Sequence, residues 1–277
     1  MTSPADRTHA DGADDAADAA ADAADVPSPA AASAPRRAAL VTGGSRGIGL
    51  AIAERLAAEG FSLTIAARSR DALDAASAAL AARGARVVAV EADAADPEAI
   101  DRLVAHHEKA WGRLDALVLN AGMGFASPIA ETPLRRVDKH YALNLRGTFA
   151  MVAAALPLLR RTAVGEPRGA RVIALASLAG LMAEPDLAAY SATKAAVVSL
   201  CESICLEEAA TGVSATALCP GYVDTDMAAW KHDEIAPADM IRATDLAELA
   251  VSLTRLSRNA AVPTIAVHRA QGGLRGA

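Results

Sequence analysis

Aromatic residues and cysteines are scarce in this chain. Phe, Trp and Tyr together make up 3% of the 277 residues, although hydrophobic residues as a whole make up 53%. Ala, Val, Leu and Ile must therefore supply the core, which favours parallel strands buried on both faces. The three cysteines, Cys201, Cys205 and Cys219, lack the spacing of metal ligands. We expect small apolar groups in a reduced protein, and we predict no metal site.

Two further absences narrow the protein's surroundings and partners. The sequence has neither a signal-peptide h-region nor an apolar run long enough to span a bilayer, so we expect a cytoplasmic protein without a membrane partner. The formal net charge of −6 arises in residues 1–35, which hold seven Asp and one Arg, and the remaining 26 acidic and 26 basic residues balance. A neutral folded part gives no argument for a nucleic-acid partner.

Residues 1–35 differ in composition from everything that follows. They are mostly Ala, Asp, Pro and Ser, and such a segment cannot bury enough apolar surface to offset the entropy lost on ordering. The sequence therefore predicts a disordered Ala/Asp-rich tail over 1–35 and one folded domain over 36–277.

Within this domain, short apolar runs alternate with helical patterns. The seven runs that predict strands are AALV, FSLTIAAR, ARVVAVEAD, RLDALVLNAG, ARVIALAS, VSATALCPG and VPTIAVH. The longest helical pattern covers 133–162 as one helix, with Pro157 as its candidate kink. Strands that alternate with helices indicate a parallel sheet with right-handed crossovers. The predicted fold class is α/β, with a seven-stranded, doubly wound (Rossmann) sheet in a single domain.

Three glycines follow the first predicted strand and open a helix. Gly43, Gly47 and Gly49 have the spacing G-x-x-x-G-x-G. Without side chains at these positions, the backbone can turn tightly and approach a pyrophosphate at the helix amino terminus. The placement between a buried strand and an amphipathic helix favours a dinucleotide-binding loop over a merely structural turn.

Ser177, Tyr190 and Lys194 supply a hydroxyl, a phenol and an ammonium group. On a helix, Tyr190 and Lys194 lie one turn apart on the same face. A cation within about 4–6 Å lowers the pKa of a phenol, ordinarily about 10, by roughly 1–3 units. Tyr190 could then exchange a proton near neutrality, and Ser177, at the carboxyl end of a strand, could bond a substrate oxygen. By itself the Tyr–Lys spacing more often marks an ordinary amphipathic pair, so the other motifs must decide.

Seven motifs together give residues 38–270 a resemblance to the short-chain dehydrogenase/reductase family, and to its one-domain, 3-oxoacyl reductase-like members in particular. In the family's order they are TGGSRGIG at 42–49, Asp93, NAG at 120–122, Asn144 in ALNLRG, Ser177, YSATK at 190–194 and PGYVDT at 220–225.

The resemblance implies hydride transfer between a nicotinamide cofactor and a small-molecule carbonyl or alcohol, such as a 3-oxoacyl thioester. Tyr190 would be the general acid or base, and Lys194 would lower its pKa and bind the nicotinamide ribose. Ser177 would hold the substrate oxygen, and Asn144 would hold a water that links Lys194 to solvent. The implied cofactor-binding residues are Gly43, Ser45, Arg46, Gly47, Ile48, Gly49, Arg68, Asp93, Asn120, Ala121, Gly122, Tyr190, Lys194, Pro220, Gly221, Val223 and Thr225.

Two arginines favour NADP(H) over NAD(H). NAD-specific relatives usually carry an Asp at the end of the second strand, where its carboxylate accepts the ribose hydroxyls. Here that position has Arg68, and the first acid is Asp71. Arg46 in the glycine loop adds a second guanidinium that could clamp a phosphate.

The sequence also bears on subunits and on rival functions. Apolar helices at 133–162 and 189–210 predict a homotetramer or homodimer. Two rivals stay open: a non-catalytic NADP-binding redox sensor, against which the intact Ser–Tyr–Lys set argues, and an epimerase or dehydratase, which usually has more residues after the position of Thr225. Two departures from the family pattern are Leu119 before Asn120, and the ending AVHRAQGGLRGA, which leaves the subunit contacts of that end open.

Overall fold

The computed structural model of this chain describes residues 36–271. The predicted disordered segment 1–35 and the end of the predicted domain, 272–277, lie outside the described residues.

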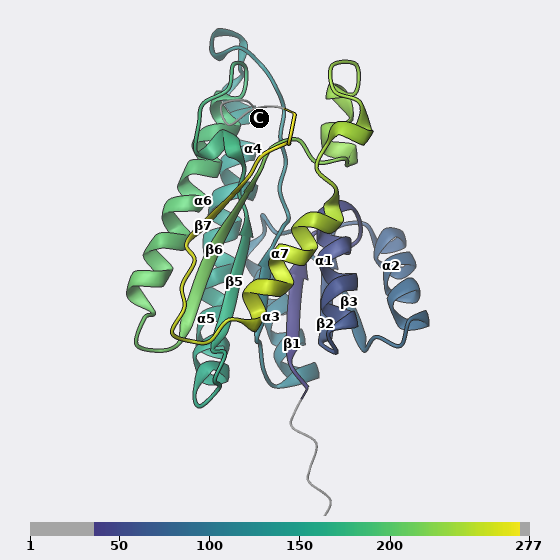
Figure 1. Cartoon of the computed structure of the whole chain (residues 1–277), viewed down its shortest axis with the longest axis vertical. Coiled ribbons are helices and arrows are strands. Elements are labelled where there is room, and N and C mark those ends of the chain that lie inside the picture. Colours follow the sequence, from purple (N-terminus) through teal and green to yellow (C-terminus); the bar gives the residue numbers. More distant parts are fainter. Residues whose placement is uncertain (1–35, 272–277) are drawn as a thin grey trace, which may run out of the picture. The chain divides into compact units, whose positions relative to one another are not determined.

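A parallel sheet organises the described part of the chain (Figure 1). Its strands are β1 (Ala38–Thr42), β2 (Ser62–Ala67), β3 (Val87–Glu91), β4 (Ala116–Leu119), β5 (Ala170–Leu175), β6 (Val213–Pro220) and β7 (Thr264–Val267). The seven strands lie in the order β3-β2-β1-β4-β5-β6-β7, and every neighbouring pair is parallel. The predicted fold class is confirmed. The order changes direction between β1 and β4, and in such sheets ligands bind outside the carboxyl ends of the strands at that point.

Helices cover both faces of the sheet (Figure 1). They are α1 (Gly47–Ala58), α2 (Arg70–Ala82), α3 (Pro97–Trp111), α4 (Leu134–His140), α5 (Thr148–Ala163), α6 (Ala188–Glu207) and α7 (Ala243–Arg255), with short helical turns η1 (Ile129–Glu131), η3 (Leu178–Gly180), η4 (Asp226–Lys231) and η5 (Pro237–Asp239). Side chains of β1 alternate between two cores: Leu40 packs with α3, α5 and α6, whereas Ala39 and Val41 pack with α1, α2 and α7. Burial on both faces explains why the central strands are mostly apolar, although Arg171 in β5 and Thr216 in β6 are buried polar residues.

The long helix predicted over 133–162 is continuous but not uniform. Between α4 and α5 lies η2 (Tyr141–Gly147), a π-helical stretch that contains Asn144. The irregular turn is therefore at 141–147, whereas Pro157 lies inside α5. π-Helical stretches are rare in proteins as a whole, and those that occur often lie at functional sites.

The same continuous helix, Leu134–Ala163, corrects one expectation. It is long and apolar enough to cross a membrane by length and composition, because an 18-residue window of it holds at most two charged residues. The sequence was expected to contain no such run. Met151, Ala155 and Leu159 of this helix are buried in the core against the sheet, so these apolar residues of α5 serve packing, whereas Phe149 is exposed.

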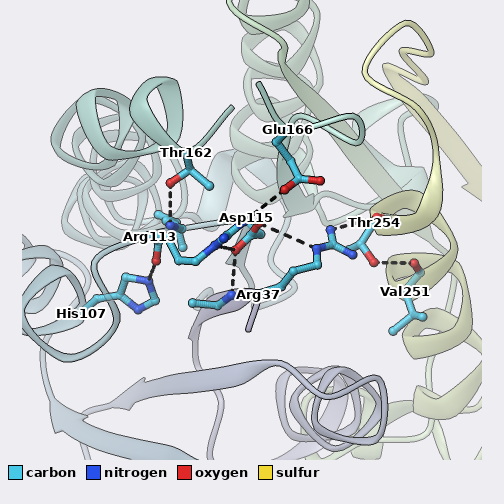
Figure 2. Close-up of polar contacts among 10 residues, drawn as sticks. Arg37, His107, Arg113, Asp115, Thr162, Glu166, Val251 and Thr254 are labelled. Carbon is cyan, nitrogen blue, oxygen red and sulfur yellow. Dashed lines mark hydrogen bonds and ion pairs between the residues drawn. The ribbon is translucent and has the colours of Figure 1, made fainter. Parts of the chain in front are cut away.

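A buried carboxylate fixes the amino ends of β1 and β4 (Figure 2). Asp115 accepts hydrogen bonds from the backbone N–H of Ala38 (2.7 Å) and from Nε and Nη2 of Arg113 (2.8 and 2.6 Å), while Arg37 lies 3.8 Å away. Arg113 also donates to Glu166 at 3.3 Å. A buried charge needs such pairing. This network lies at the amino ends of the strands. The carboxyl ends, on the opposite side of the sheet, stay free for ligands.

Candidate active site

The glycine-rich loop between β1 and α1 depends on the absence of side chains. Gly43 and Gly47 have φ values of +63° and +54°, which L-residues with a side chain rarely adopt. At Gly49 a Cβ atom would lie 2.3 Å from the Gly43 carbonyl oxygen and 2.4 Å from Nδ2 of Asn120. Gly49 therefore serves close packing of helix against loop, whereas Gly43 and Gly47 set the turn.

Thr42, the last residue of β1, and Asn120, which follows the neighbouring strand β4, brace this loop. The Asn120 amide Nδ2 donates to the carbonyl oxygens of Thr42 (3.2 Å) and Gly43 (3.0 Å). Thr42 Oγ1 accepts from the backbone N–H groups of Asn120 and Ala121. The structural role of Thr42 was missed by the sequence analysis, although this residue stands first in TGGSRGIG. Leu119, the departure from the family pattern, is buried in the core.

The amino terminus of α1 is suited to an anion. Its N-cap residue, Arg46, makes no side-chain capping bond, and the first turn contains no acidic residue. The first N–H groups of a helix lack partners within the helix, and its dipole favours negative charge at that end. The backbone N–H groups at this end of α1 therefore suit the pyrophosphate group of a dinucleotide.

A groove of about 830 Å³ runs past the loop. It is of the size that small-molecule ligands occupy. Of the residues implied for cofactor binding, those lining this groove are Gly43, Ser45, Arg46, Gly47, Ile48, Arg68, Asp93, Asn120, Ala121, Gly122 and Thr225. Gly49 does not line the groove. The remaining implied residues line the cleft described below and are Tyr190, Lys194, Pro220, Gly221 and Val223. The groove therefore extends from the end of β2 to the carboxyl ends of β4 and β6.

The two arginines implied for a phosphate differ in their contacts. Arg46 Nη1 donates to Asp226 Oδ2 at 2.9 Å, and both side chains are exposed. Arg68 follows β2, is exposed and lines the groove. An exposed ion pair is worth little, so Asp226 holds Arg46 only weakly.

Ser177 and Tyr190 lie together at the carboxyl end of β5. Ser177 follows that strand, and Tyr190 lies in the first turn of α6. Burial raises the pKa of Tyr190, and a side-chain hydrogen bond with Ser177 opposes this as a smaller effect. The phenol is therefore protonated at neutral pH in this structure, so it can donate a proton.

Lys194 lies one helical turn beyond Tyr190 on α6. Its Nζ donates to the carbonyl oxygen of Leu175 at 2.6 Å and lies 5.7 Å from the centre of the Tyr190 ring. Burial lowers the pKa of Lys194 to about 8. Lys194 is not among the groups that shift the Tyr190 pKa here, and the charges that do act on it, those of Cys219 and Glu184, raise it as desolvation does. The lowering of this pKa by Lys194 therefore stays a prediction.

Asn144 is held in the π-helical stretch behind this set. Its Oδ1 accepts from the Met123 backbone N–H, and its Nδ2 donates to the Met123 carbonyl oxygen (both 2.9 Å) and to Thr193 Oγ1 (3.2 Å). Asn144 is buried and lines neither the groove nor the cleft. The structure thus places it as a link between the turn after β4 and α6.

A smaller cleft of about 140 Å³ adjoins the groove. Ser177, Tyr190, Lys194, Pro220, Gly221 and Val223 line it, and Ile48, Asn120, Gly122 and Thr225 line both spaces. Its other walls come from residues that the sequence analysis did not assign to the site, chiefly Met123, Phe125, Glu184, Leu187, Tyr222 and Trp230. Tyr222 lies inside the PGYVDT motif, and its position in that motif could have identified it as a residue of the site.

In the described residues no cluster of three or more His, Cys, Asp or Glu side chains could hold a metal ion. Cys201 and Cys219 are buried, Cys205 is half-buried, and all three are free thiols. The groove and cleft together therefore offer hydroxyl, phenol, ammonium and backbone donors.

Comparisons with known proteins agree with this arrangement. The family profile described as short chain dehydrogenase matches residues 37–236. A 2-(R)-hydroxypropyl-CoM dehydrogenase of Xanthobacter autotrophicus is 34% identical over 211 residues, which are 75% of this chain and 82% of that protein. The 3-oxoacyl-acyl-carrier-protein reductase MabA of Mycobacterium bovis is 35% identical over 191 residues, 69% of this chain and 71% of that protein.

A solved structure is similar as well. The alcohol dehydrogenase of the archaeon Thermococcus sibiricus, in complex with 5-hydroxy-NADP, superposes with a TM-score of 0.76 at 26% identity, covering 85% of this chain and 97% of that one. The matched profile spans most of the described residues and the likeness extends over the whole sheet. The chain therefore belongs to the short-chain dehydrogenase family and is an oxidoreductase that uses a nicotinamide cofactor on small-molecule substrates.

Proposed function

We propose that the chain transfers a hydride between NADP(H) and the carbonyl or alcohol carbon of a small molecule, with Tyr190 as the general acid or base. The observation that carries this proposal is that Tyr190 and Ser177 both line the cleft that adjoins the groove, with the Tyr190 ring next to Gly124, which lines both spaces. The nicotinamide, when bound, supplies or accepts the hydride.

Each residue of the set has a separate task in the proposed reaction. Ser177 Oγ holds the substrate oxygen, and Tyr190 gives that oxygen a proton during reduction or takes one during oxidation. Lys194, already close to the end of β5, binds the ribose of the nicotinamide. Asn144 acts through the turn at Met123 and through Thr193, so it is a positioning residue.

The preference for NADP(H) rests on the amino-acid side chains at the end of β2. Arg68 is exposed there and lines the groove, and the nearest acid along the chain is Asp71 in the first turn of α2. Arg46 can leave Asp226 at little cost and join Arg68 on a phosphate. The Thermococcus sibiricus alcohol dehydrogenase, whose structure contains an NADP derivative, gives the proposal further support.

Removal of the transferable proton tests the proposal. A screen of ketones and alcohols with NADPH and NADP would first identify an accepted substrate. On that substrate, Tyr190→Phe should reduce kcat by about 10²–10⁴-fold, the usual contribution of a general acid or base. The ring and its packing stay, so a fluorescence titration should give nearly the wild-type Kd for NADPH.

Two results would contradict the assignment. Retention by Tyr190→Phe of more than about a tenth of the wild-type kcat would exclude the phenol as the proton donor. No turnover of any carbonyl or alcohol, together with tight NADPH binding, would favour the redox sensor over the enzyme. Turnover without net oxidation or reduction of added cofactor would favour an epimerase.

A further inference from the structure

The substrate cleft contains one acidic side chain. Among the described residues that line it, only Glu184 and Lys194 carry a charge, and Lys194 is buried with its ammonium group on the Leu175 carbonyl oxygen. Most of the remaining lining is apolar, with Phe125, Leu187 and Trp230 among it. A single carboxylate in a largely apolar cleft is an orienting group of the kind that fixes ligands in such sites.

Glu184 is held from the opposite wall of the cleft. Tyr222, two residues beyond β6, donates its hydroxyl proton to Glu184 Oε1 at 2.5 Å. The Tyr222 ring meets the Trp230 ring edge to face, with the centroids 6.1 Å apart. A tyrosine that is itself packed against an indole gives the carboxylate a defined position, which a free surface glutamate would lack.

The segment that carries Glu184 is also fixed through its backbone. Asp186 has a φ of +64°, and its carbonyl oxygen accepts from the Ser127 N–H at 2.7 Å. The N–H of Leu187 closes a turn onto the Glu184 carbonyl oxygen at 3.3 Å. Left-handed backbone at a residue other than glycine persists only where the surrounding structure imposes it, so the loop between η3 and α6 is built to present Glu184.

The contacts leave one carboxylate oxygen for a ligand. Oε1 accepts from Tyr222, and no residue within 36–271 has a recorded hydrogen bond to Oε2. An ionised carboxylate only accepts hydrogen bonds, so Oε2 suits an O–H or N–H donor. Burial and the neighbouring Glu184 raise the pKa of Tyr222, which keeps the phenol a donor and the carboxylate its acceptor.

Two cations, Lys231 and Arg269, act on Tyr222 from outside the cleft. Lys231 lies over the rings of Tyr222 and Trp230 and pairs with Glu234 at 2.8 Å. Arg269 affects Tyr222 through its charge. Neither Lys231 nor Arg269 lines the cleft, so a substrate that enters meets the negative charge of Glu184.

We propose that Glu184, anchored by Tyr222, is the specificity-determining residue of this cleft. It accepts a hydrogen bond from a hydroxyl or ammonium group that the substrate carries near its reacting carbonyl, and it repels substrates with an anionic group at that position. The substrate class is thus a hydroxylated or amino-bearing ketone, or the corresponding alcohol, with an apolar remainder. This inference rests on the proposed function, because it concerns the substrate of the same site.

Three ketones of nearly equal size separate these effects. Hydroxyethyl methyl ketone carries the donor, methyl propyl ketone replaces the hydroxyl with a methyl group, and acetoacetate carries a carboxylate. Wild-type protein should prefer the hydroxyketone over each of the others by about tenfold or more in kcat/KM, since a hydrogen bond to a charged group discriminates at that level. Calorimetric Kd values on the NADP-loaded protein give the same comparison without turnover.

Variants of the pair assign the preference to Glu184. Glu184→Gln should raise kcat/KM for acetoacetate by about tenfold relative to the hydroxyketone. Tyr222→Phe frees the carboxylate, so it should weaken the preference for the hydroxyl while KM changes more than kcat. Glu98→Gln is the matched control, because it makes the same charge change at an exposed position of α3 that does not line the cleft, and it should keep the wild-type ratios.

The results separate failure of this inference from failure of the proposed function. Three results would each overturn the role of Glu184. They are an equal kcat/KM or Kd for the hydroxyketone and its methyl isostere, a higher kcat/KM or lower Kd of wild type for acetoacetate than for the hydroxyketone, and no measurable binding of the hydroxyketone. A preference that Glu184→Gln leaves unchanged would do the same. Loss of hydride transfer with retained selectivity in Kd would instead reject the proposed reaction and keep the binding role.

Discussion

The pKa values of Tyr190 and Lys194 in the site are shifted more by desolvation than by neighbouring charges. Tyr190 and Lys194 are close in sequence and both approach the cleft, yet burial raises the pKa of the first and lowers that of the second. In this state Tyr190 is set to donate a proton.

Cofactor choice is predicted to depend on Arg68. Wild-type protein should use NADPH over NADH by more than about tenfold in kcat/KM, because Arg68 lines the groove and no acid occupies the end of β2. Arg68→Asp should erase or invert that ratio in steady-state assays. Arg70→Asp is the matched control, since Arg70 pairs with Asp74 and does not line the groove.

Two outcomes would contradict this prediction. Equal efficiency of wild type with both cofactors would show that the arginines do not contact a phosphate. An unchanged ratio in the double variant Arg46→Ala, Arg68→Asp would lead to the same conclusion.

His107 is predicted to make stability fall in acid. Its Nε2 lies 2.9 Å from the Arg113 carbonyl oxygen and its Nδ1 2.9 Å from Thr64 Oγ1, which itself accepts from Trp111. A carbonyl oxygen can only accept, so the proton is on Nε2. The neutral ring fits this pocket, and burial lowers its pKa to about 4 from an ordinary value of 6.5.

The unfolded chain therefore binds the His107 proton first as pH falls. Stability is complete above the unfolded pKa and is lost between about pH 6.5 and pH 4, by about 3 kcal/mol in total. Urea titrations at several pH values should show this loss reduced in His107→Gln. His106→Gln changes an exposed neighbour and should keep the wild-type profile. A wild-type free energy of unfolding that is flat over this range would contradict the prediction.

Among the elements, the glycine loop and the end of the π-helical stretch leave no room for a side chain, since a Cβ at Gly147 would lie 2.0 Å from the Ala94 carbonyl oxygen. In the loop, Gly49→Ala would place Cβ against the Gly43 carbonyl oxygen and the Asn120 amide. Overpacking of this kind costs about 1–3 kcal/mol. We expect a lower melting temperature and much weaker NADPH binding, measured by thermal unfolding and fluorescence titration.

Gly124→Ala is the comparison for this prediction. Its Cβ would lie 3.4 Å from the Tyr190 ring, which is an ordinary to slightly tight contact. The melting temperature should stay near that of wild type. If both variants melt at the wild-type temperature, the close approach at Gly49 does not constrain the loop.

For the whole molecule, the open question is assembly. Large apolar side chains stay exposed on the helices predicted to form subunit contacts: Tyr141 in η2, Phe149 in α5 and Leu206 in α6. Such surfaces usually mark interfaces. We predict a homodimer or homotetramer by light scattering at micromolar concentration, with Phe149→Glu shifting the mass towards the monomer.

Ile129→Glu provides the control, because Ile129 is also exposed but lies on η1, outside the two predicted helices. It should leave the mass unchanged. A monomeric wild-type protein would contradict the assembly prediction and would leave Phe149 and Leu206 without a partner surface.

The sequence by itself determined the sheet and the family. Runs such as Ala38–Thr42 and Val213–Pro220 are mostly apolar because both faces are buried, and that pattern is local, so it can be read without the fold. Motif spacing likewise indicated that Ser177, Tyr190 and Lys194 would meet.

Only the tertiary structure decided what surrounds those residues. The bond of Lys194 to the Leu175 carbonyl oxygen, the brace of Thr42 on Asn120, and the pair of Glu184 with Tyr222 join segments distant in the sequence. The residue pattern records which side chains avoid water. It does not record which of them meet across the cleft, or how far burial shifts a pKa, because both depend on distances and desolvation that exist only after the strands and helices have packed.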